Sequence, residues 1–201
     1  SEFPRSTLEA LRQPLEDGHV LVVRGQQSVL FPCRTMLVAA TNPCPCGYGG
    51  TARCRCSEVE HARHARRLSG PLLDRIDLSV RVDRPSAAEL QAPALRSSAV
   101  ERARVAAARE RQTARFAGTG VTCNAEMDPR LLRRDVRLGD VAERQLARVY
   151  ERGLLSARGR HRVLRVARTI ADLAGSDDVR SSHLLSALAL REDTGQAEVA
   201  A

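Results

Sequence analysis

The stretch that decides the fold is residues 35–42, Thr-Met-Leu-Val-Ala-Ala-Thr-Asn, which runs directly into a proline and a loop rich in glycine and cysteine. A continuous apolar run bounded by turn residues is typical of a strand buried on both faces of a parallel sheet. We therefore predict such a strand over residues 35–40, with the amide of Asn42 at its carboxyl end. Open α/β sheets bind ligands at this end of their strands. An ordinary Asn-Pro turn is the alternative interpretation of Asn42.

The residues before this strand predict a helix and a hairpin. Ser6 and Glu9 have the spacing of a capping box, and leucines at helical spacing follow, so a helix should begin at Ser6. Pro14 should bend or end that helix, and Gly18 should close it. Residues 19–31 hold two runs of β-forming residues around a polar Gly-Gln-Gln turn, which predicts a hairpin.

The segments after the cysteine loop predict one more strand and a set of helices. Ser57 and Glu60 match a second capping box, which predicts a helix that runs to about Arg67. Apolar and polar side chains alternate over residues 78–82, as in a half-buried strand. Residues 84–98 have the Pro, Ala and Ser content of a linker. Beyond the linker, the pattern predicts helices at residues 100–116, 140–155, 156–173 and 181–191.

The composition limits the class of fold and of chemistry. Aromatic residues make up only 2% of the 201 residues, so the core must be built from aliphatic side chains, which favours helices and parallel strands. All 32 basic residues are Arg, which excludes a Walker A lysine, a Schiff-base lysine and a pyridoxal-phosphate enzyme. A net charge of +8 favours an anionic partner such as DNA, although a general bias toward Arg explains it almost as well. No apolar run is long enough to span a membrane.

Six cysteines and no recognisable signal peptide predict a reducing compartment, namely the cytoplasm. Four of them lie close together, at Cys44, Cys46, Cys54 and Cys56. Four thiolates can hold one tetrahedral Zn²⁺, and the glycines between the two Cys-x-Cys pairs allow the loop to fold back. Four reduced thiols in a glycine loop are the alternative. His61 and His64 could also bind metal, but we expect them to be exposed polar residues.

The order of strand, Asn42, cysteine loop and the segment Arg-Leu-Ser-Gly-Pro-Leu-Leu-Asp-Arg-Ile-Asp-Leu at residues 67–78 resembles an AAA+ ATPase core. The chain most resembles the magnesium-chelatase-like group, in particular its ComM/YifB members. This resemblance implies an α/β plus all-α fold: the C-terminal part of an AAA+ core with parallel strands and a hairpin, followed by a helical lid. The implied limits are 1–83 for the partial core, 84–98 for the linker, 99–195 for the lid and 196–201 for a disordered tail.

The resemblance also implies roles for five residues. Asn42 would be sensor 1, which orients the attacking water near the γ-phosphate of ATP. Arg75 would be an arginine finger that reaches the nucleotide of a neighbouring subunit. Arg158 would be the sensor 2 arginine of the lid. Arg24 and Gln26 would lie at the tip of a hairpin that touches DNA.

The arginines and the hairpin tip have structural alternatives too. Arg75 could instead pair with Asp74 or Asp77 on the surface. Arg158 could be one more surface arginine, because several others follow it within ten residues. The hairpin tip lacks aromatic residues that would stack on bases, so it could be an ordinary exposed turn.

The resemblance implies that the parent protein is a ring-forming ATPase, most simply a hexamer. It would use ATP and Mg²⁺ to remodel DNA by branch migration, in recombination and natural transformation. Because the Walker A and Walker B motifs are absent, we expect this chain to be the C-terminal part of a longer motor and to be inactive alone. Two alternatives stay open: the motor subunit of magnesium chelatase, and a non-enzymatic zinc-dependent module that binds nucleic acid.

Overall fold

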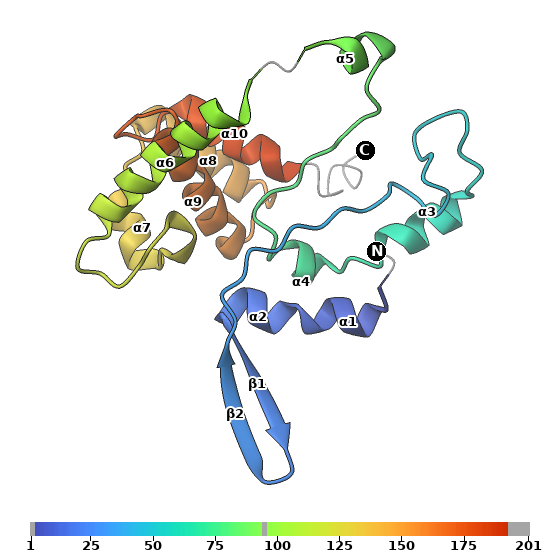
Figure 1. Ribbon diagram of the computed structural model, residues 1–201, viewed down its shortest axis with the longest axis horizontal. Helices are drawn as coiled ribbons and strands as arrows, with labels where there is room; N and C mark the ends of the chain where they lie inside the picture. The colour runs from blue at the N-terminus through green and yellow to red at the C-terminus, as the bar shows by residue number, and fades with distance from the viewer. Residues whose placement is uncertain (1–2, 94–95, 193–201) are drawn as a thin grey trace. The chain divides into compact units, whose positions relative to one another are not determined.

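The computed structural model describes residues 3–93 and 96–192. The chain divides into two compact units, Ser1–Ile76 and Asp77–Ala201, which are drawn in Figure 1. The division falls inside the segment that the sequence assigned to the core, so the limits 1–83, 84–98 and 99–195 stay predictions. The predicted tail at residues 196–201 lies outside the described residues.

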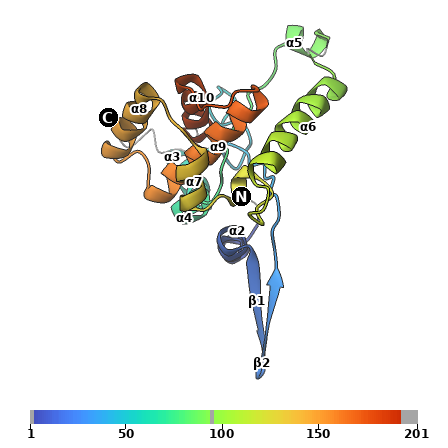
Figure 2. The same ribbon diagram turned by 90° about the vertical axis from the view of Figure 1, so that its left-hand side faces the viewer.

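The first unit consists of short helices and one hairpin. Its elements are α1 (Arg5–Ala10), α2 (Arg12–Asp17), β1 (His19–Arg24), β2 (Gln27–Pro32), α3 (Glu58–Ala65) and α4 (Gly70–Leu73). Gly18 ends α2 as predicted, because its φ of 66° is a left-handed conformation that glycine adopts without strain. The predicted hairpin is also confirmed: β1 and β2 pair antiparallel, with Arg24 opposite Gln27 across a two-residue turn. Figure 2 shows it projecting beyond α2.

The predicted capping box at Ser6 is wrong. Helix α1 begins after Pro4 without a side-chain cap, and Ser6 lies inside its first turn. The carboxylate of Glu9 is engaged elsewhere, since it accepts a hydrogen bond from Arg12 at 2.9 Å and another from Ser69. The expected bend occurs at Leu11, which separates α1 from α2.

The two predicted strands at residues 35–40 and 78–82 do not form. The prediction of parallel strands in the core is therefore wrong for this chain. Both segments have an extended, irregular backbone, and Met36 and Val82 are 90% and 86% exposed. A parallel strand exists only where neighbouring strands satisfy its backbone hydrogen bonds. Within the described residues, β1 and β2 pair only with each other, so no sheet is present to receive these runs.

The second unit is helical. Its elements are α5 (Ala87–Gln91), α6 (Ser98–Arg115), the 3₁₀ turn η1 (Asn124–Glu126), α7 (Pro129–Asp135), α8 (Asp140–Glu151), α9 (Ala157–Leu173) and α10 (Ser181–Glu192). The four predicted helices correspond to α6, α8, α9 and α10. The predicted linker contains α5, which a capping box between Ser86 and Glu89 begins. Helix α7 was not predicted, although Asp128 caps it and Pro129 starts it.

Helix α9 is the centre of the second unit, and it contacts α6, α7, α8, α10 and η1 (Figure 2). Its apolar face supplies Val163, Leu164, Ala167 and Ala171 to the buried core. Leu146 of α8 and Leu184 of α10 are buried in the same cluster. The aliphatic core that the composition predicts is therefore confirmed for this unit.

Asp172 of α9 is buried beside this core, and its side chain is 0% exposed. It accepts hydrogen bonds from Arg115 at 2.9 Å, Asn124 at 2.8 Å and Arg168 at 2.9 Å. Burial opposes ionisation, but the hydrogen bonds from Arg115 and Asn124 and the charge of Arg168 outweigh it and lower the pKa of Asp172. The network joins α6, η1 and α9, and Arg168 also donates to the carbonyls of Ser176 and Asp177.

We predict that Asp172→Asn destabilises the helical unit by about 3 kcal/mol at neutral pH, because Arg168 is left buried without its charged partner. The pKa of Asp172 is below its ordinary value of 3.8, so its contribution is present above that pH and is lost as the pH falls through the folded-state pKa. Urea unfolding followed by helical circular dichroism, at neutral pH and in acid, measures both effects. Asp177→Asn is the matched control, since its carboxylate is 96% exposed. Equal midpoints for the two variants would contradict the assignment.

Candidate functional site

The cysteine loop closes on itself through tight turns. The backbone N–H of Gly47 donates to the carbonyl of Cys44, and that of Cys54 donates to Thr51, each at 3.0 Å. Gly47 and Gly50 have φ values of 79° and 78°, which only glycine adopts easily. These turns bring residues ten apart in sequence together, and the Sγ atoms of Cys44 and Cys54 lie 3.8 Å apart.

Helix α3 adds an imidazole to the sulfur cluster. The capping box of Ser57 and Glu60 forms as predicted and starts α3 directly after the last cysteine of the loop. This places His61 in the first turns of the helix, with its Nε2 atom 3.2 Å from Sγ of Cys54. His61 is half-buried, so the expectation that it is an exposed polar residue is wrong. The sequence did contain a signal for this contact, because His61 lies in the first turns of a capped helix that directly follows the cysteines.

Four ligand atoms of this cluster lie within 4.8 Å of one another, and they belong to Cys44, Cys54, Cys56 and His61. Sγ of Cys46 lies 3.3 Å from Cys44 and 3.7 Å from Cys54. Zn–S bonds of about 2.3 Å in a tetrahedron separate the sulfurs by about 3.8 Å. The spacing of the donor atoms therefore fits one metal ion, and five donors are available for four positions.

The thiols of the cluster do not titrate alike. Backbone hydrogen bonds with Arg55 and then Tyr48 favour the thiolate of Cys46 and lower its pKa to about 6. A backbone hydrogen bond favours the thiolate of Cys56, but burial and the nearby sulfurs of Cys46 and Cys44 outweigh it and raise its pKa to about 12. Several thiolates at this spacing repel one another, so a bound cation would favour the state in which all ligands are deprotonated.

Asn42 is held in place through its backbone. The Nε2–H group of His64 in α3 donates to the carbonyl oxygen of Asn42 at 2.9 Å. His64 is 8% exposed, so the expectation that it is an exposed polar residue is wrong. Asn42 itself is exposed, at the end of the extended segment 35–40. Helix α3 thus connects the cysteine loop at one turn to Asn42 at the next.

Arg75 follows α4, whose first turn is capped by the hydroxyl of Ser69. Its side chain is 13% exposed, with Nε 2.8 Å from a carboxylate oxygen of Glu16. One Nη atom donates to the carbonyl of Pro71 at 2.6 Å. The prediction that Arg75 points outward is therefore wrong for this chain, and its partner is Glu16 of α2 rather than Asp74 or Asp77. Sequence reasoning missed Glu16 because it lies 59 positions away.

Arg158 lies in the first turn of α9, where the hydroxyl of the predicted cap Ser156 accepts a hydrogen bond from the amide of Gly159 at 2.9 Å. The arginines after it include three with structural partners. Arg162 binds Asp77 at 2.7 Å, Arg165 donates to the carbonyl of Met127 at 3.0 Å, and Arg168 belongs to the buried network. The side chain of Arg158 is exposed.

Arg24 and Gln26 lie at the tip of the hairpin, in the exposed turn whose Gly25 has a φ of 62°. Their predicted contact with DNA stays a prediction. The structure brings together the four cysteines and adds His61, and it connects this cluster to Asn42. Arg158 belongs to the second unit, whereas Asn42 and Arg75 belong to the first.

Comparison with known proteins gives the chain its family. The family model described as magnesium chelatase, subunit ChlI, matches residues 1–90. The model described as magnesium chelatase, subunit ChlI C-terminal, matches residues 95–191. The chain belongs to the magnesium-chelatase-like family. This family has an AAA+-related fold, and the helix-rich structure with its hairpin is compatible with it.

Relatives of this magnesium-chelatase-like chain include the competence protein ComM of Haemophilus influenzae, 41% identical over 192 residues. An uncharacterized protein of Mycobacterium tuberculosis is 42% identical over 192 residues, and the uncharacterized protein YifB of Escherichia coli is 38% identical over 192 residues. The alignments cover 96%, 94% and 94% of this chain for the M. tuberculosis, H. influenzae and E. coli proteins, but only 38%, 37% and 37% of those relatives. Among the described helices, none combines the length and apolar character that crossing a membrane requires.

Proposed function

We propose that this chain forms the nucleotide-sensing part of a cytoplasmic, ring-forming AAA+ ATPase, most simply a hexamer, that remodels DNA during recombination and natural transformation. The observation that carries the proposal is the 41% identity to competence protein ComM over nearly the whole chain. The motif residues support it: Asn42 ends an extended segment, Arg75 follows a capped turn, and Arg158 begins a central helix. All six cysteines are free thiols, as a reducing compartment requires.

Each of the three residues has a distinct role in this proposal. Bound ATP and Mg²⁺ would supply the phosphoryl group and neutralise part of its charge. The Asn42 amide would orient the attacking water, with its backbone held by His64. Arg158 would bind the phosphates of the same subunit, near a helix N-terminus that favours anions.

Arg75 would act on the nucleotide of the neighbouring subunit. In this chain its guanidinium is bound to Glu16, a single carboxylate that is itself partly exposed. A γ-phosphate carries more negative charge than a carboxylate, so it attracts a guanidinium more strongly. Glu16 would therefore hold Arg75 in readiness and release it when a subunit with ATP docks alongside.

The isolated chain should release no phosphate from ATP, with or without DNA. It contains no Lys to bind the β- and γ-phosphates, which a nucleotide-hydrolysing site of this class requires. A phosphate-release assay on the purified chain measures this. Turnover at the rate of a motor protein would contradict the division of labour proposed here.

A further prediction concerns Arg75→Ala in a full-length protein that carries this chain. ATP hydrolysis should fall by about 10³-fold or more while nucleotide binding is nearly unchanged, because a finger acts mainly in the transition state. Arg158→Ala should weaken nucleotide binding together with turnover. Mixtures of Arg75→Ala subunits with subunits that lack the Walker A lysine should regain activity, since each supplies what the other lacks. Mixed rings without any recovery would show that Arg75 is only the partner of Glu16.

We also propose that the cysteine loop holds one structural Zn²⁺, bound by Cys44, Cys54, Cys56 and His61. The ligand atoms of these four residues all lie within 4.8 Å of one another. A closed tetrahedral shell of four protein ligands leaves no position for a substrate. Cys46 lies beside this group, and the set of four cysteines predicted from the sequence is the competing assignment. Zinc would fix the loop against α3, and through His64 it would steady Asn42.

Elemental analysis of protein purified without chelator should give one zinc per chain. Cys44→Ser with Cys54→Ser should abolish it under both assignments, since both cysteines belong to each set. His61→Ala should lower the zinc content, whereas Cys46→Ser should leave one zinc per chain. The reverse result would establish the site of four thiolates. A folded loop free of metal in the wild-type protein would contradict zinc altogether.

The motor subunit of magnesium chelatase is the second candidate, because both matching family models carry that description. The two enzymes differ in what stimulates hydrolysis. A DNA motor responds to DNA, and a chelatase motor responds to its porphyrin-binding partner. A non-enzymatic zinc module would bind nucleic acid regardless of nucleotide, and this outcome would separate it from both motors.

A further inference from the structure

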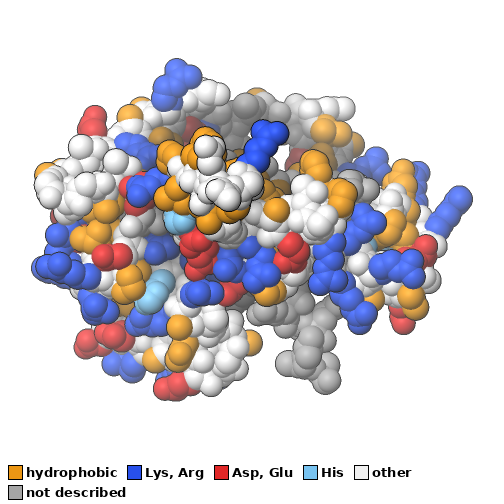
Figure 3. All heavy atoms as spheres, turned by 90° about the horizontal axis from the view of Figure 1, so that it is seen from below, with side chains coloured by type: hydrophobic (Ala, Val, Ile, Leu, Met, Phe, Trp, Pro, Cys, Tyr) orange, Lys and Arg blue, Asp and Glu red, His pale blue; other side chains and the backbone are white. Residues whose placement is uncertain are grey.

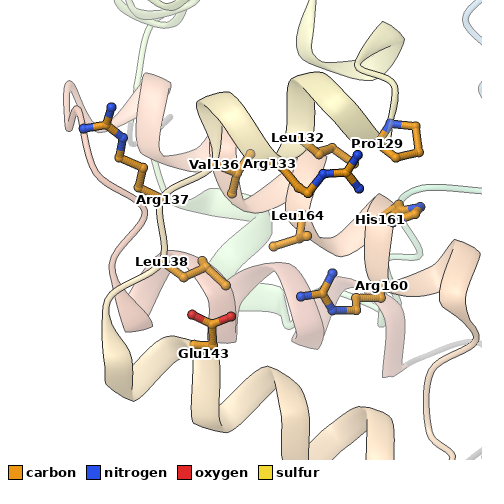
Figure 4. A pocket seen from close by; sticks show the side chains of 10 residues that line it. All are labelled: Pro129, Leu132, Arg133, Val136, Arg137, Leu138, Glu143, Arg160, His161 and Leu164. Carbon is orange, nitrogen blue, oxygen red and sulfur yellow. The ribbon is translucent and has the colours of Figure 1, made fainter.

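The second unit contains a groove that none of the roles above uses. It has a volume of about 510 Å³ and lies where α7, the segment after it, α8 and α9 meet (Figure 4). Its lining residues are Pro129, Leu132, Arg133, Val136, Arg137, Leu138, Glu143, Arg160, His161 and Leu164. Three arginines and one histidine therefore line the groove together with a single carboxylate. In Figure 4 the guanidinium group of Arg137 points away from the other labelled side chains.

The groove has an apolar floor and a basic rim. Leu132, Val136 and Leu164 belong to the buried core and form the floor. In Figure 4, Arg133 comes from α7 and Arg160 from α9, and their guanidinium groups lie on opposite sides of Leu164. This combination suits a ligand that has both an anionic part and a flat apolar part.

The arginines of the rim differ from neighbouring arginines in α7 and α9, because those neighbours have carboxylate partners. Arg134 pairs with Asp135 at 2.7 Å, and Arg162 pairs with Asp77 at 2.7 Å. The guanidinium groups of Arg133, Arg137 and Arg160 make no ion pair or hydrogen bond with any side chain in the described part of the chain. Unneutralised arginines around a hollow create a positive potential that attracts anions.

The titration of His161 is consistent with that potential. Burial lowers the pKa of His161, and the charges of Arg160, Arg165 and Arg133 lower it further. The imidazole is therefore neutral at physiological pH, and its ring can stack on a base while the arginines carry the charge.

The groove is separate from the face of α9 that carries Arg158. Residues two apart on a helix point about 200° apart, so Arg158 and Arg160 lie on opposite faces of α9. A ligand in the groove therefore need not compete with a nucleotide at Arg158.

We propose that this groove binds a single strand of nucleic acid, with phosphates on Arg133 and Arg160 and a base against the apolar floor and His161. The proposal rests on the proposed function, because it takes DNA as the partner. A peptide made only of acidic residues would satisfy the arginines but would leave the floor without a matching flat group. On the face drawn in Figure 3, acidic side chains lie among the arginines, so charge alone does not select a site on that face.

The test is fluorescence anisotropy of a labelled oligothymidine titrated with the full 201-residue chain at several salt concentrations. Arg133→Glu with Arg160→Glu should weaken binding by about tenfold or more. It should also reduce the slope of log K against log salt by about 1.4, which is about 0.7 for each phosphate of a single strand that the variant no longer neutralises. Arg102→Glu with Arg148→Glu is the control of equal charge, because both side chains are exposed and neither lines the groove. Thermal unfolding of each variant verifies the fold.

Any of four results would overturn the proposal. The groove and control variants could bind equally, or polyglutamate could displace the oligothymidine as well as unlabelled oligothymidine does. The wild-type chain could also fail to bind at low salt. None of these touches the ATPase tests on Arg75, so the groove can fail while the proposed motor function stands. If binding is lost in Arg24→Ala alone, DNA contact belongs to the hairpin and not to the groove.

Discussion

The buried carboxylate of Asp172 is the interaction on which the helical unit depends. It is the common acceptor for Arg115, Asn124 and Arg168, so α6, η1 and α9 cannot shift relative to one another without breaking a charged hydrogen bond. An ion in the interior is tolerated only when every lone pair is satisfied, and a partly satisfied network costs more than an apolar one. This constraint fixes the rotation of α9 about its axis. That rotation in turn decides that Arg158 is exposed and that Arg160 lines the groove.

In the first unit, helix α3 connects separate segments of the chain, as the Asp172 network does in the second unit. Its capping box sets the start of the helix, and two histidines three positions apart then meet different partners. His61 meets the cysteine loop, and His64 holds the backbone of Asn42. A metal in the loop would thus be coupled mechanically to Asn42 across one helical turn. The pairing of Arg75 with Glu16 adds a second link within the same unit, between the segment after α4 and α2.

Local signals in the sequence predicted the hairpin, the Ser57 cap and the helices α6, α8, α9 and α10, because turn residues, caps and apolar period act over a few residues. The strand over residues 35–40 failed for the opposite reason: its apolar run is adapted to a sheet, and a strand is stable only with neighbours. The family resemblance carried by Asn42, Arg75 and Arg158 is confirmed at the level of the family. Their roles rest on the proposed function.

By itself, the sequence determined the family, the aliphatic core, the absence of any lysine and the clustering of four cysteines. Only the tertiary structure decided which side chains meet: His61 with the cysteines, Arg75 with Glu16, and three arginines around one groove. The physical reason is the separation along the chain over which each kind of interaction acts. Caps, turns and periodicity are set by neighbours along the chain, whereas the partner of a charged side chain depends on which distant segments the core packing brings within a few ångströms.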